Sequence, residues 1–451
     1  MKIIIVGDGK VGYTLTDKLS REGHDVTVID NNPAALKNTT DRHDVIGIAG
    51  NGATFSVQQE AGADKADLLI AATSADELNL LCCMVAKKLG TQHTIARVRN
   101  PEYSEQMSYL KDELYLSMHI NPELAAAEEI SRILRFPSVI KIEPFSKGKA
   151  ELVEIRLAEG NPLIGVSLNA LQNKFQVKVL VCAVKRGEAV YIPKGDFVLE
   201  ENDKISISAS PSEISALFRK LNLVQYKVKN VMIAGGGRIA YYLTRQLATM
   251  GIKVKIIEND PERCRELTSL LPATMVIYSN ASDKEMLHEE GLEDMDAFVA
   301  LTGLDEENII ISLYASACGV PKVITKVSNI AFPAMLEKLG LDTVVSPKDI
   351  TADQIVRYVR AMENSVGSSM ESLYKIANGE VEAMEFRIRS GLPFLGTPLK
   401  DLRLKKEVLI ACIVRNGKTI IPGGNTTIEA GDSVIVVTAN EDVRDLMDIV
   451  D

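Results

Sequence analysis

Two short segments of this sequence have the residue types and the spacing that bind phosphate groups. The first contains the pattern GxGxxG and consists of Gly7, Asp8, Gly9, Lys10, Val11 and Gly12. In such a loop the first glycine permits a tight turn, the second lets the backbone approach a pyrophosphate, and the third lets the helix pack on the strands. Asp30 follows at the distance where a carboxylate accepts hydrogen bonds from a ribose. The segment therefore predicts a nucleotide-binding site.

The elements that must position this loop occur in the order of a dinucleotide-binding fold. An apolar run over residues 3–6 predicts a buried strand, and a helix pattern with Leu15 and Leu19 on one face follows the loop. Residues 26–29 predict a second strand that ends at Asp30. The helix start presents free N–H groups and a positive dipole end to the phosphates. Because glycine loops alone are common, this register of strand, helix and acid is what favours nucleotide binding over a plain turn.

The same stretch occurs a second time, 228 residues later in the chain. Its loop and acid comprise Gly235, Gly236, Gly237, Arg238, Ile239 and Glu258. Arg238 stands where the first copy has Lys10, and Glu258 stands where it has Asp30. Ala240 replaces the third glycine, and alanine is an allowed small residue at this helix-packing position. An internal duplication therefore sets the organisation of the chain.

Further polar residues follow later predicted strands of the first copy, namely Asn51, Thr73, Ser74 and Arg97. Asn51 is either a ligand of the ribose or adenine or a simple turn residue. Thr73 serves either the ligand or the local turn, and Ser74 is also a candidate N-cap of the helix that starts at Asp76. Arg97 contacts either a phosphate or a carboxylate in a surface ion pair.

Three of these positions recur in the second half with an offset of 229 residues, as Asn280, Thr302 and Lys326. A cation is thus retained at the position of Arg97, which favours the phosphate contact. A duplication kept only for packing would not need to retain polar residues. The turn around Asn51 has changed from GNG to SNA, so we expect the second site to be altered or weaker.

Composition argues against several classes of function. The chain has 451 residues, 46% of them apolar, and a formal net charge of −10, which disfavours nucleic acid or anionic lipid as the main partner. No apolar run approaches the length of about 20 residues that a membrane-spanning helix needs. The N-terminus enters a predicted strand at once, so we expect no signal peptide. The six cysteines show no CxxC spacing and the five histidines form no cluster, so we expect free thiols and no metal site.

The repeats divide the chain into two halves of the same design. We expect an α/β fold with two tandem Rossmann-like, doubly wound parallel-sheet domains, each followed by a connecting helix and a small α+β domain. The expected parts are residues 1–120, 121–138, 139–222, 229–346, 347–366 and 367–451. Each small domain shows short strands joined by glycine- and aspartate-rich turns, and is predicted to close with a helix, over 212–221 and over 440–449.

The two connecting helices carry apolar residues at helical spacing, which are Ile130, Ile133 and Leu134 in the first and Ile355, Val356 and Val359 in the second. Such stripes usually belong to a core. Because these helices connect domains, contact with another subunit is the alternative interpretation.

Two kinds of domain thus each occur twice in the sequence. In this pattern the chain resembles the TrkA-type regulatory subunits of bacterial and archaeal Trk potassium uptake systems. These are built of two tandem RCK (or KTN) units, each a Rossmann-like nucleotide domain followed by a small RCK C-terminal domain. The resemblance covers essentially the whole chain. It depends on VGDGKVG with VID, GNGATF, EAGADKADLLIAATSADELN, IARVRNPEY and the duplicated PLIG and PFLG segments.

The resemblance implies a regulatory function without catalysis. Proteins of this kind are cytoplasmic rings on the inner face of the cell membrane. They bind NAD(H), or ATP and ADP in related cases, and act on a separate membrane subunit that conducts potassium. The implied contacts are Gly7 to Val11, Asp30, Thr73, Ser74 and Arg97 in one site, and Gly235 to Ile239, Glu258, Asn280, Thr302 and Lys326 in the other. Self-association, as a ring of dimers, is expected for tandem units of this kind.

Some questions stay open at this point. Lys10 departs from the neutral residue often seen in first halves of this family, and it either brings a positive charge to the phosphates or points to solvent. The carboxylates of Asp30 and Glu258 disfavour NADP, because they would repel its 2′-phosphate, but they do not separate NAD from ATP. An NAD-dependent dehydrogenase would use the same fold, yet no acid or base constellation occurs in the small domains. A sensor of another effector is a third interpretation.

Overall fold

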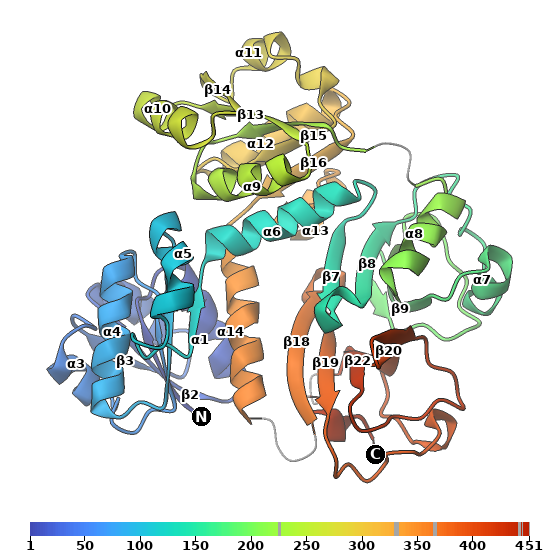
Figure 1. Cartoon of the computed structure of the whole chain (residues 1–451), viewed down its shortest axis with the longest axis horizontal. Helices are drawn as coiled ribbons and strands as arrows, with labels where there is room; N and C mark the ends of the chain where they lie inside the picture. The colour runs from blue at the N-terminus through green and yellow to red at the C-terminus, as the bar shows by residue number, and fades with distance from the viewer. Residues whose placement is uncertain (224–226, 329–332, 364–367, 441–442, 444, 451) are drawn as a thin grey trace.

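The chain forms four sheets, two parallel and two antiparallel, that alternate along the sequence (Figure 1). This computed structural model describes residues 1–451 except 224–226, 329–332, 364–367, 441–442, 444 and 451. Each parallel sheet has six strands and each antiparallel sheet has five. The predicted fold class is therefore confirmed: two doubly wound parallel-sheet units, each followed by a small antiparallel one.

The first parallel sheet has the strand order β3-β2-β1-β4-β5-β6. Its strands are β1 (Lys2–Val6), β2 (Asp25–Asp30), β3 (Ile46–Ala49), β4 (Leu68–Ala71), β5 (His93–Arg97) and β6 (Met118–Ile120). Its helices are α1 (Lys10–Arg21), α2 (Pro33–Thr40), α3 (Phe55–Glu60), α4 (Asp76–Leu89) and α5 (Pro101–Leu110). The order reverses between β1 and β4, and ligands of open α/β sheets bind in the crevice at such a reversal.

The second parallel sheet repeats this order as β14-β13-β12-β15-β16-β17. Its strands are β12 (Asn230–Ala234), β13 (Lys253–Glu258), β14 (Met275–Tyr278), β15 (Ala297–Ala300), β16 (Lys322–Lys326) and β17 (Val344–Val345). Its helices are α9 (Arg238–Thr249), α10 (Pro261–Leu270), α11 (Lys284–Glu289), α12 (Asp305–Ala317) and α13 (Pro333–Lys338). The offsets found in the sequence thus correspond to equivalent strands in two sheets.

The antiparallel sheets have the orders β10-β9-β11-β8-β7 and β18-β19-β22-β20-β21. The first contains β7 (Lys141–Phe145), β8 (Ala150–Arg156), β9 (Leu180–Arg186), β10 (Ala189–Tyr191) and β11 (Lys204–Ala209), with α7 (Leu168–Phe175) and α8 (Pro211–Lys220). The second contains β18 (Ser368–Ile376), β19 (Val381–Ile388), β20 (Val408–Arg415), β21 (Lys418–Ile420) and β22 (Ser433–Thr438).

One closing helix agrees with the prediction and the other does not. The helix expected over 212–221 is α8. The helix expected over 440–449 is wrong: among the residues described there, only a 3-10 turn over Leu446–Ile449 forms. Asp445 and Asp448 make a capping box that starts this turn at Leu446, and the backbone of Asp445 itself is extended.

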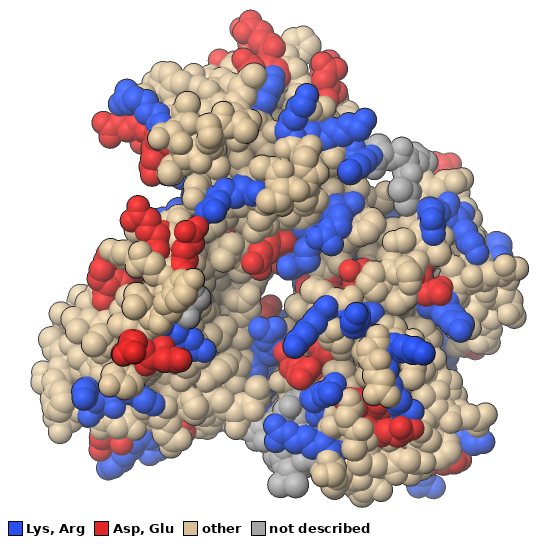
Figure 2. All heavy atoms as spheres, viewed as in Figure 1, with Lys and Arg blue, Asp and Glu red and all other residues tan. Residues whose placement is uncertain are grey.

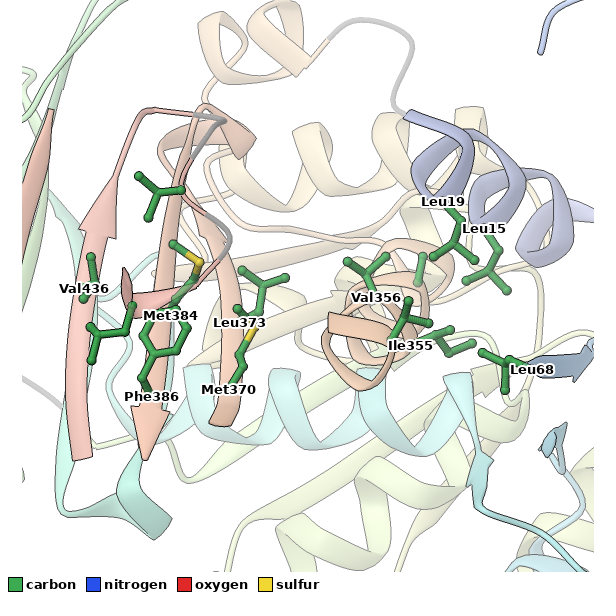
Figure 3. Packing of buried hydrophobic residues seen from close by; sticks show 14 of the residues in the cluster. Leu15, Leu19, Leu68, Ile355, Val356, Met370, Leu373, Met384, Phe386 and Val436 are labelled. Atoms are coloured by element: carbon green, nitrogen blue, oxygen red, sulfur yellow. The ribbon is translucent and has the colours of Figure 1, made fainter. Parts of the chain in front are cut away.

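The two connecting helices each cross to the opposite half of the molecule. α6 (Pro122–Arg135) leaves the first parallel sheet and packs on α9 of the second, while α14 (Pro347–Glu363) leaves the second and packs on α1 of the first. Figure 3 shows Leu15 and Leu19 of α1 facing Ile355 and Val356 of α14. The predicted apolar stripes are therefore core. The stripe of α6 joins the core of the second parallel sheet, and that of α14 joins a core formed by α1 and by β18, β19 and β22.

The antiparallel sheets also pack on each other, with β7 and β8 beside β18 and β19 (Figure 1). Phe145, Leu152 and Cys182 of one sheet share a buried cluster with Ala383 and Cys412 of the other. Both levels of packing join the two halves, so the chain is built like a dimer whose halves are covalently linked.

Charges of both signs are interspersed over the face of the molecule seen in Figure 2. Among the residues that the structure describes, none of the helices combines the length and the apolar character that a bilayer crossing requires.

Candidate functional site

The first candidate site is a cavity of about 480 Å³ at the carboxyl ends of β1, β2, β4 and β5. This volume is in the range of small-molecule sites. The predicted residues that line the cavity are Gly7, Gly9, Lys10, Val11, Asp30, Asn51, Thr73, Ser74 and Arg97. The topology brings them together because parallel strands end at one edge of the sheet, next to the point where the strand order reverses.

The acid at the end of β2 is held in place by the glycine loop. One carboxylate oxygen of Asp30 accepts a hydrogen bond from the backbone N–H of Asp8 at 2.6 Å, and the other accepts one from Asn32 at 2.8 Å. Each oxygen keeps a further lone pair for a ligand hydroxyl. In the second half, Glu258 accepts in the same way from the N–H of Gly236 at 2.6 Å. Loop and acid are therefore oriented as one unit in both copies.

The glycines of the first loop have different physical roles. Gly7 has a φ of +99°, and a Cβ there would lie 3.0 Å from the backbone nitrogen of Thr73. A Cβ on Gly12 would lie 1.8 Å from the carbonyl oxygen of Gly7, so only glycine lets α1 start this close to the turn. By contrast, nothing lies within 4 Å of a Cβ built on Gly9. The space beside Gly9 fits a pyrophosphate that approaches the backbone.

Three of the predicted site residues do not line either cavity. Gly12 is buried behind the loop, and Gly236 serves through its N–H to Glu258. The carboxylate of Asp8 turns away and accepts a hydrogen bond from the Thr39 hydroxyl at 2.6 Å, and burial raises the pKa of Asp8. These residues shape the loop rather than face the cavity.

A buried asparagine organises the turn after β4. Asn79, which is fully buried, accepts hydrogen bonds from the N–H and the hydroxyl of Thr73 at 2.8 and 2.7 Å, and donates one to the carbonyl of Arg97 at 2.9 Å. In the second half, Asn308 likewise accepts a hydrogen bond from the N–H of Thr302 at 2.8 Å and donates one to the carbonyl of Lys326 at 3.1 Å. The retained polar residues therefore fix the two strand ends that face the ligand space.

The structure bears on two of the alternatives that the sequence left open, those of Asn51 and Ser74. The Asn51 side chain accepts a hydrogen bond from the N–H of Ala53 at 3.0 Å, so it shapes a turn, and it also lines the cavity. The prediction that Ser74 caps α4 is wrong, because the N-cap is Ala75 and no side chain makes the capping bond. In the turn before the helix, the N–H of Thr73 donates to the Asn79 side chain at 2.8 Å and the N–H of Ala75 donates to the Thr73 hydroxyl at 3.4 Å.

Cations dominate the first cavity. Lys10, Arg97 and Arg99 line it, against the single acid Asp30. Arg97 is not in a surface ion pair: its side chain is only 14% exposed, and burial lowers its pKa. Arg97 and Arg99 each lie 3.7 Å from the carboxylate of Glu123 on α6. Such an arrangement favours an anionic ligand.

The second candidate site is a cavity of about 490 Å³ with the opposite charge balance. The predicted residues that line it are Gly235, Gly237, Arg238, Ile239, Glu258, Asn280, Thr302 and Lys326. Glu307 and Glu123 line it as well, so acids outnumber the two cations. This agrees with the expectation that the second site is altered.

Sequence reasoning missed two residues of these cavities, Arg99 and Glu123. Arg99 belongs to the quoted segment IARVRNPEY, but its repeat is Ser328, so the duplication does not point to it. Glu123 lies on a helix that departs from the first half, and only the exchange of helices brings it to the second cavity. No group of three His, Cys, Asp or Glu side chains among the described residues has the arrangement of a metal site.

Comparison with known families and structures agrees with this organisation. The TrkA-N domain family matches residues 3–115 and 231–347, and the TrkA-C domain family matches residues 152–222 and 383–451. The chain is 33% identical over 450 residues to the Trk system potassium uptake protein TrkA of Halomonas elongata, covering 99% of this chain and 98% of that protein. It is 32% identical over 449 residues to the TrkA homologue of Archaeoglobus fulgidus, covering all of both.

Among solved structures, the fold is similar to the GsuK channel. The GsuK RCK domain superposes with a TM-score of 0.64 at 17% identity, covering 98% of this chain and 92% of that one. GsuK bound to NAD gives a TM-score of 0.64 at 18% identity, covering 98% of this chain and 77% of that one. GsuK bound to ADP gives 0.52 at 14% identity, covering 79% and 69%.

Proposed function

This chain belongs to the TrkA family of potassium uptake proteins, and on that basis we propose that it is a nucleotide-binding regulatory subunit that gates a separate membrane potassium transporter of the Trk type. The observation that carries the proposal is the pair of cavities at the two strand-order reversals, each with an acid that its glycine loop holds in place. A regulator of this kind works by differential affinity, because a ligand shifts a two-state assembly only as far as it binds one state better.

The proposed ligand of the first cavity is NAD(H), with ATP or ADP as the alternative. Asp30 would accept hydrogen bonds from the adenosine ribose, and the backbone from Gly7 to Val11 would hold the phosphates beside Gly9. Lys10, Arg97 and Arg99 would neutralise them. The NAD and ADP complexes of the similarly folded GsuK support nucleotides of both kinds as candidates. A 2′-phosphate would meet the Asp30 carboxylate, so we expect NADP(H) to bind at least about tenfold more weakly than NAD(H).

The proposed second site uses Gly235 to Ile239, Glu258, Asn280, Thr302 and Lys326. Since acids outnumber cations around it, we expect it to bind an anionic nucleotide more weakly than the first site does.

The proposed assembly is a homo-oligomer, a ring of dimers, on the cytoplasmic face of the membrane beside the transporter. Large apolar side chains are exposed at equivalent places on both halves: Leu81 of α4 is 48% exposed and Ile310 of α12 is 66% exposed. Leu110 on α5 and Met335 on α13 are exposed too. Exposed apolar residues at repeated positions support contact with further copies of the chain.

Calorimetric titration with NADH, NAD, ATP and ADP tests the proposal, on the native protein and on Asp30→Ala and Glu258→Ala. Loss of a charge-assisted hydrogen bond is worth about 1.5–3 kcal/mol, so we expect each variant to lose roughly 10- to 150-fold in affinity at its own site. Potassium uptake in cells that contain the membrane subunit should lose its nucleotide response in the Asp30→Ala variant.

Two results would contradict the proposal. Absence of binding for all four nucleotides would remove the switch and leave the small domains as the place to seek an effector. Consumption of NADH with a small-molecule oxidant at enzymatic rates would instead favour a dehydrogenase.

A further inference from the structure

One carboxylate, that of Glu123, lies beside cations of both cavities. Glu123 lies in the first turn of α6, where this helix leaves the first parallel sheet for the second. One carboxylate oxygen lies 3.7 Å from the Arg97 guanidinium and 3.7 Å from that of Arg99, both of which line the first cavity. The same side chain lines the second cavity together with Lys326.

The contacts of Glu123 with the two arginines are close enough for ion pairs but too long for hydrogen bonds. The Nε atoms of Arg97 and Arg99 and the second oxygen of Glu123 are buried, and each lacks a hydrogen-bond partner within the described part of the chain. Both arginines still line the first cavity, with side chains that are 14% and 21% exposed, so their guanidinium groups meet an anion that enters it.

Glu123 also acts on the cation of the second cavity. Burial lowers the pKa of Lys326, and the negative charges of Asp305 and Glu123 oppose this effect. A single negative charge thus balances cations of both cavities. Any anion bound in one cavity competes with Glu123 for its cations and alters the charge that the other cavity experiences.

We propose that Glu123 couples the two nucleotide sites negatively. A nucleotide phosphate that pairs with Arg97 and Arg99 in the first cavity leaves the Glu123 carboxylate without these counter-charges beside the second cavity, which weakens the binding of a second anionic nucleotide there. By linkage, a nucleotide in the second cavity weakens the first site by the same factor. The inference rests on the proposed nucleotide binding and adds that occupation of one site lowers the affinity of the other.

Although the chain is duplicated, the second half has no acidic residue equivalent to Glu123. The residue of α14 that corresponds to Glu123 is Lys348, and Lys348 does not line the first cavity. The carboxylate is therefore not part of a symmetric pair. Its removal would change a negative charge that acts on cations of both cavities.

The test compares two-site binding of ADP in the native chain with single-site binding in Asp30→Ala and in Glu258→Ala, by calorimetry in buffer without divalent cations. The coupling factor is the product of the two single-site association constants divided by the overall association constant for filling both sites of the native chain. It exceeds unity when the sites weaken each other. Coupling between sites is typically about 5- to 150-fold, and we expect a factor of at least about 5 here. The Glu123→Gln substitution, combined with each blocked site, should bring the factor to within about twofold of unity.

Glu128→Gln is the matched control, because Glu128 lies on the same helix, is exposed and lines neither cavity. It should leave the coupling factor at its native value. A native factor near unity, or a factor that Glu123→Gln leaves unchanged, would overturn the inference even though nucleotides bind. Absence of any ADP binding would instead contradict the proposed function on which it rests.

Discussion

The guanidinium of Arg360 and the carboxylate of Glu22 form a bidentate ion pair, with N–O distances of 2.7 and 3.0 Å. The two residues are 338 positions apart in the sequence. Glu22 ends α1, the helix that starts at the glycine loop, and Arg360 lies on α14. The other side of the guanidinium pairs with Glu382 of β19 at 2.8 Å. One buried arginine thus ties the first nucleotide unit to the second antiparallel sheet.

Replacement of Arg360 by alanine should destabilise the protein. It removes the guanidinium that pairs with the largely buried carboxylates of Glu22 and Glu382, which we expect to cost about 2–4 kcal/mol and to appear as a lower first transition in thermal unfolding. Arg135→Ala is the matched control, because Arg135 holds the equivalent place on α6 and Met250 replaces Glu22 in that half. Its effect should stay within about 0.5 kcal/mol; equal losses would contradict a special role for Arg360.

Gly9→Ala should separate ligand binding from stability. Gly9 has a φ of −77°, which alanine adopts, and its Cβ would meet nothing within 4 Å, so thermal stability should be unchanged. The methyl group would occupy the space proposed for the pyrophosphate, so the affinity of the first site should fall by at least about tenfold. Gly237→Ala should do the same to the second site only, and unchanged nucleotide affinity in both would contradict the placement of the phosphates.

Gly12→Ala should act on stability instead. Its Cβ would lie 1.8 Å from the carbonyl oxygen of Gly7, so α1 must move away from the loop, and overpacking of this kind costs about 1–3 kcal/mol. Urea unfolding would measure the loss. The second loop contains Ala240 at this position, so Ala240→Gly should cost no more than about 1 kcal/mol.

The buried lysine Lys322 should make stability depend on pH in a definite direction. Its ammonium donates to the carbonyl of Val139 at 2.7 Å and to the Thr343 hydroxyl at 2.8 Å, and burial lowers its pKa to about 7. Between pH 10.5 and 7 the unfolded chain takes up a proton that the folded protein does not, so this penalty grows as the pH falls and is complete below about pH 7.

Lys322→Met removes this titration. The free energy of unfolding of the native protein should therefore rise relative to the variant between pH 7 and 10, by up to about 1.4 kcal/mol per pH unit, in urea unfolding at several pH values. Lys253→Met, at an exposed position of the same sheet, is the control and should run parallel to the native protein. Parallel curves for Lys322→Met would contradict the prediction.

Self-association should depend on the exposed apolar residues of α4 and α12. Leu81→Asp and Ile310→Asp place a charge where a second copy is proposed to pack, so the mass measured by light scattering should fall toward that of one chain, 49.2 kDa. Because both side chains are exposed, the monomer should fold normally. An unchanged mass in the double variant would place the interface elsewhere.

Much of this architecture could be predicted from the sequence, because it depends on local signals that the duplication repeats. The glycine loops, Asp30 and Glu258 each follow a strand directly, and parallel strands bring such ends together. The small domains could be recognised as strands and turns, but not the late start of the turn at Leu446, which depends on a capping box of two aspartates.

The parts that could not be predicted depend on contacts between the halves. The spacing of Ile355, Val356 and Val359 shows that α14 buries one face, but not that it packs on α1 of the other half as well as on β18 and β19 of its own half. Arg99 and Glu123 have no like-charged repeat, since Ser328 and Lys348 occupy the corresponding positions. Only the exchange of helices brings Glu123 to the second cavity.

That exchange of connecting helices also governs when the protein completes its fold during synthesis. α1 is made early, but the helix that covers it, α14, begins more than 300 residues later. At a synthesis rate of about 5–20 residues per second, the apolar face of α1 stays exposed for roughly 15–65 s before α14 is synthesised. A nascent first half therefore exposes the surface that α14 later occupies. A second chain at the same stage presents the same surface, so truncated products should pair or aggregate rather than persist as folded single halves.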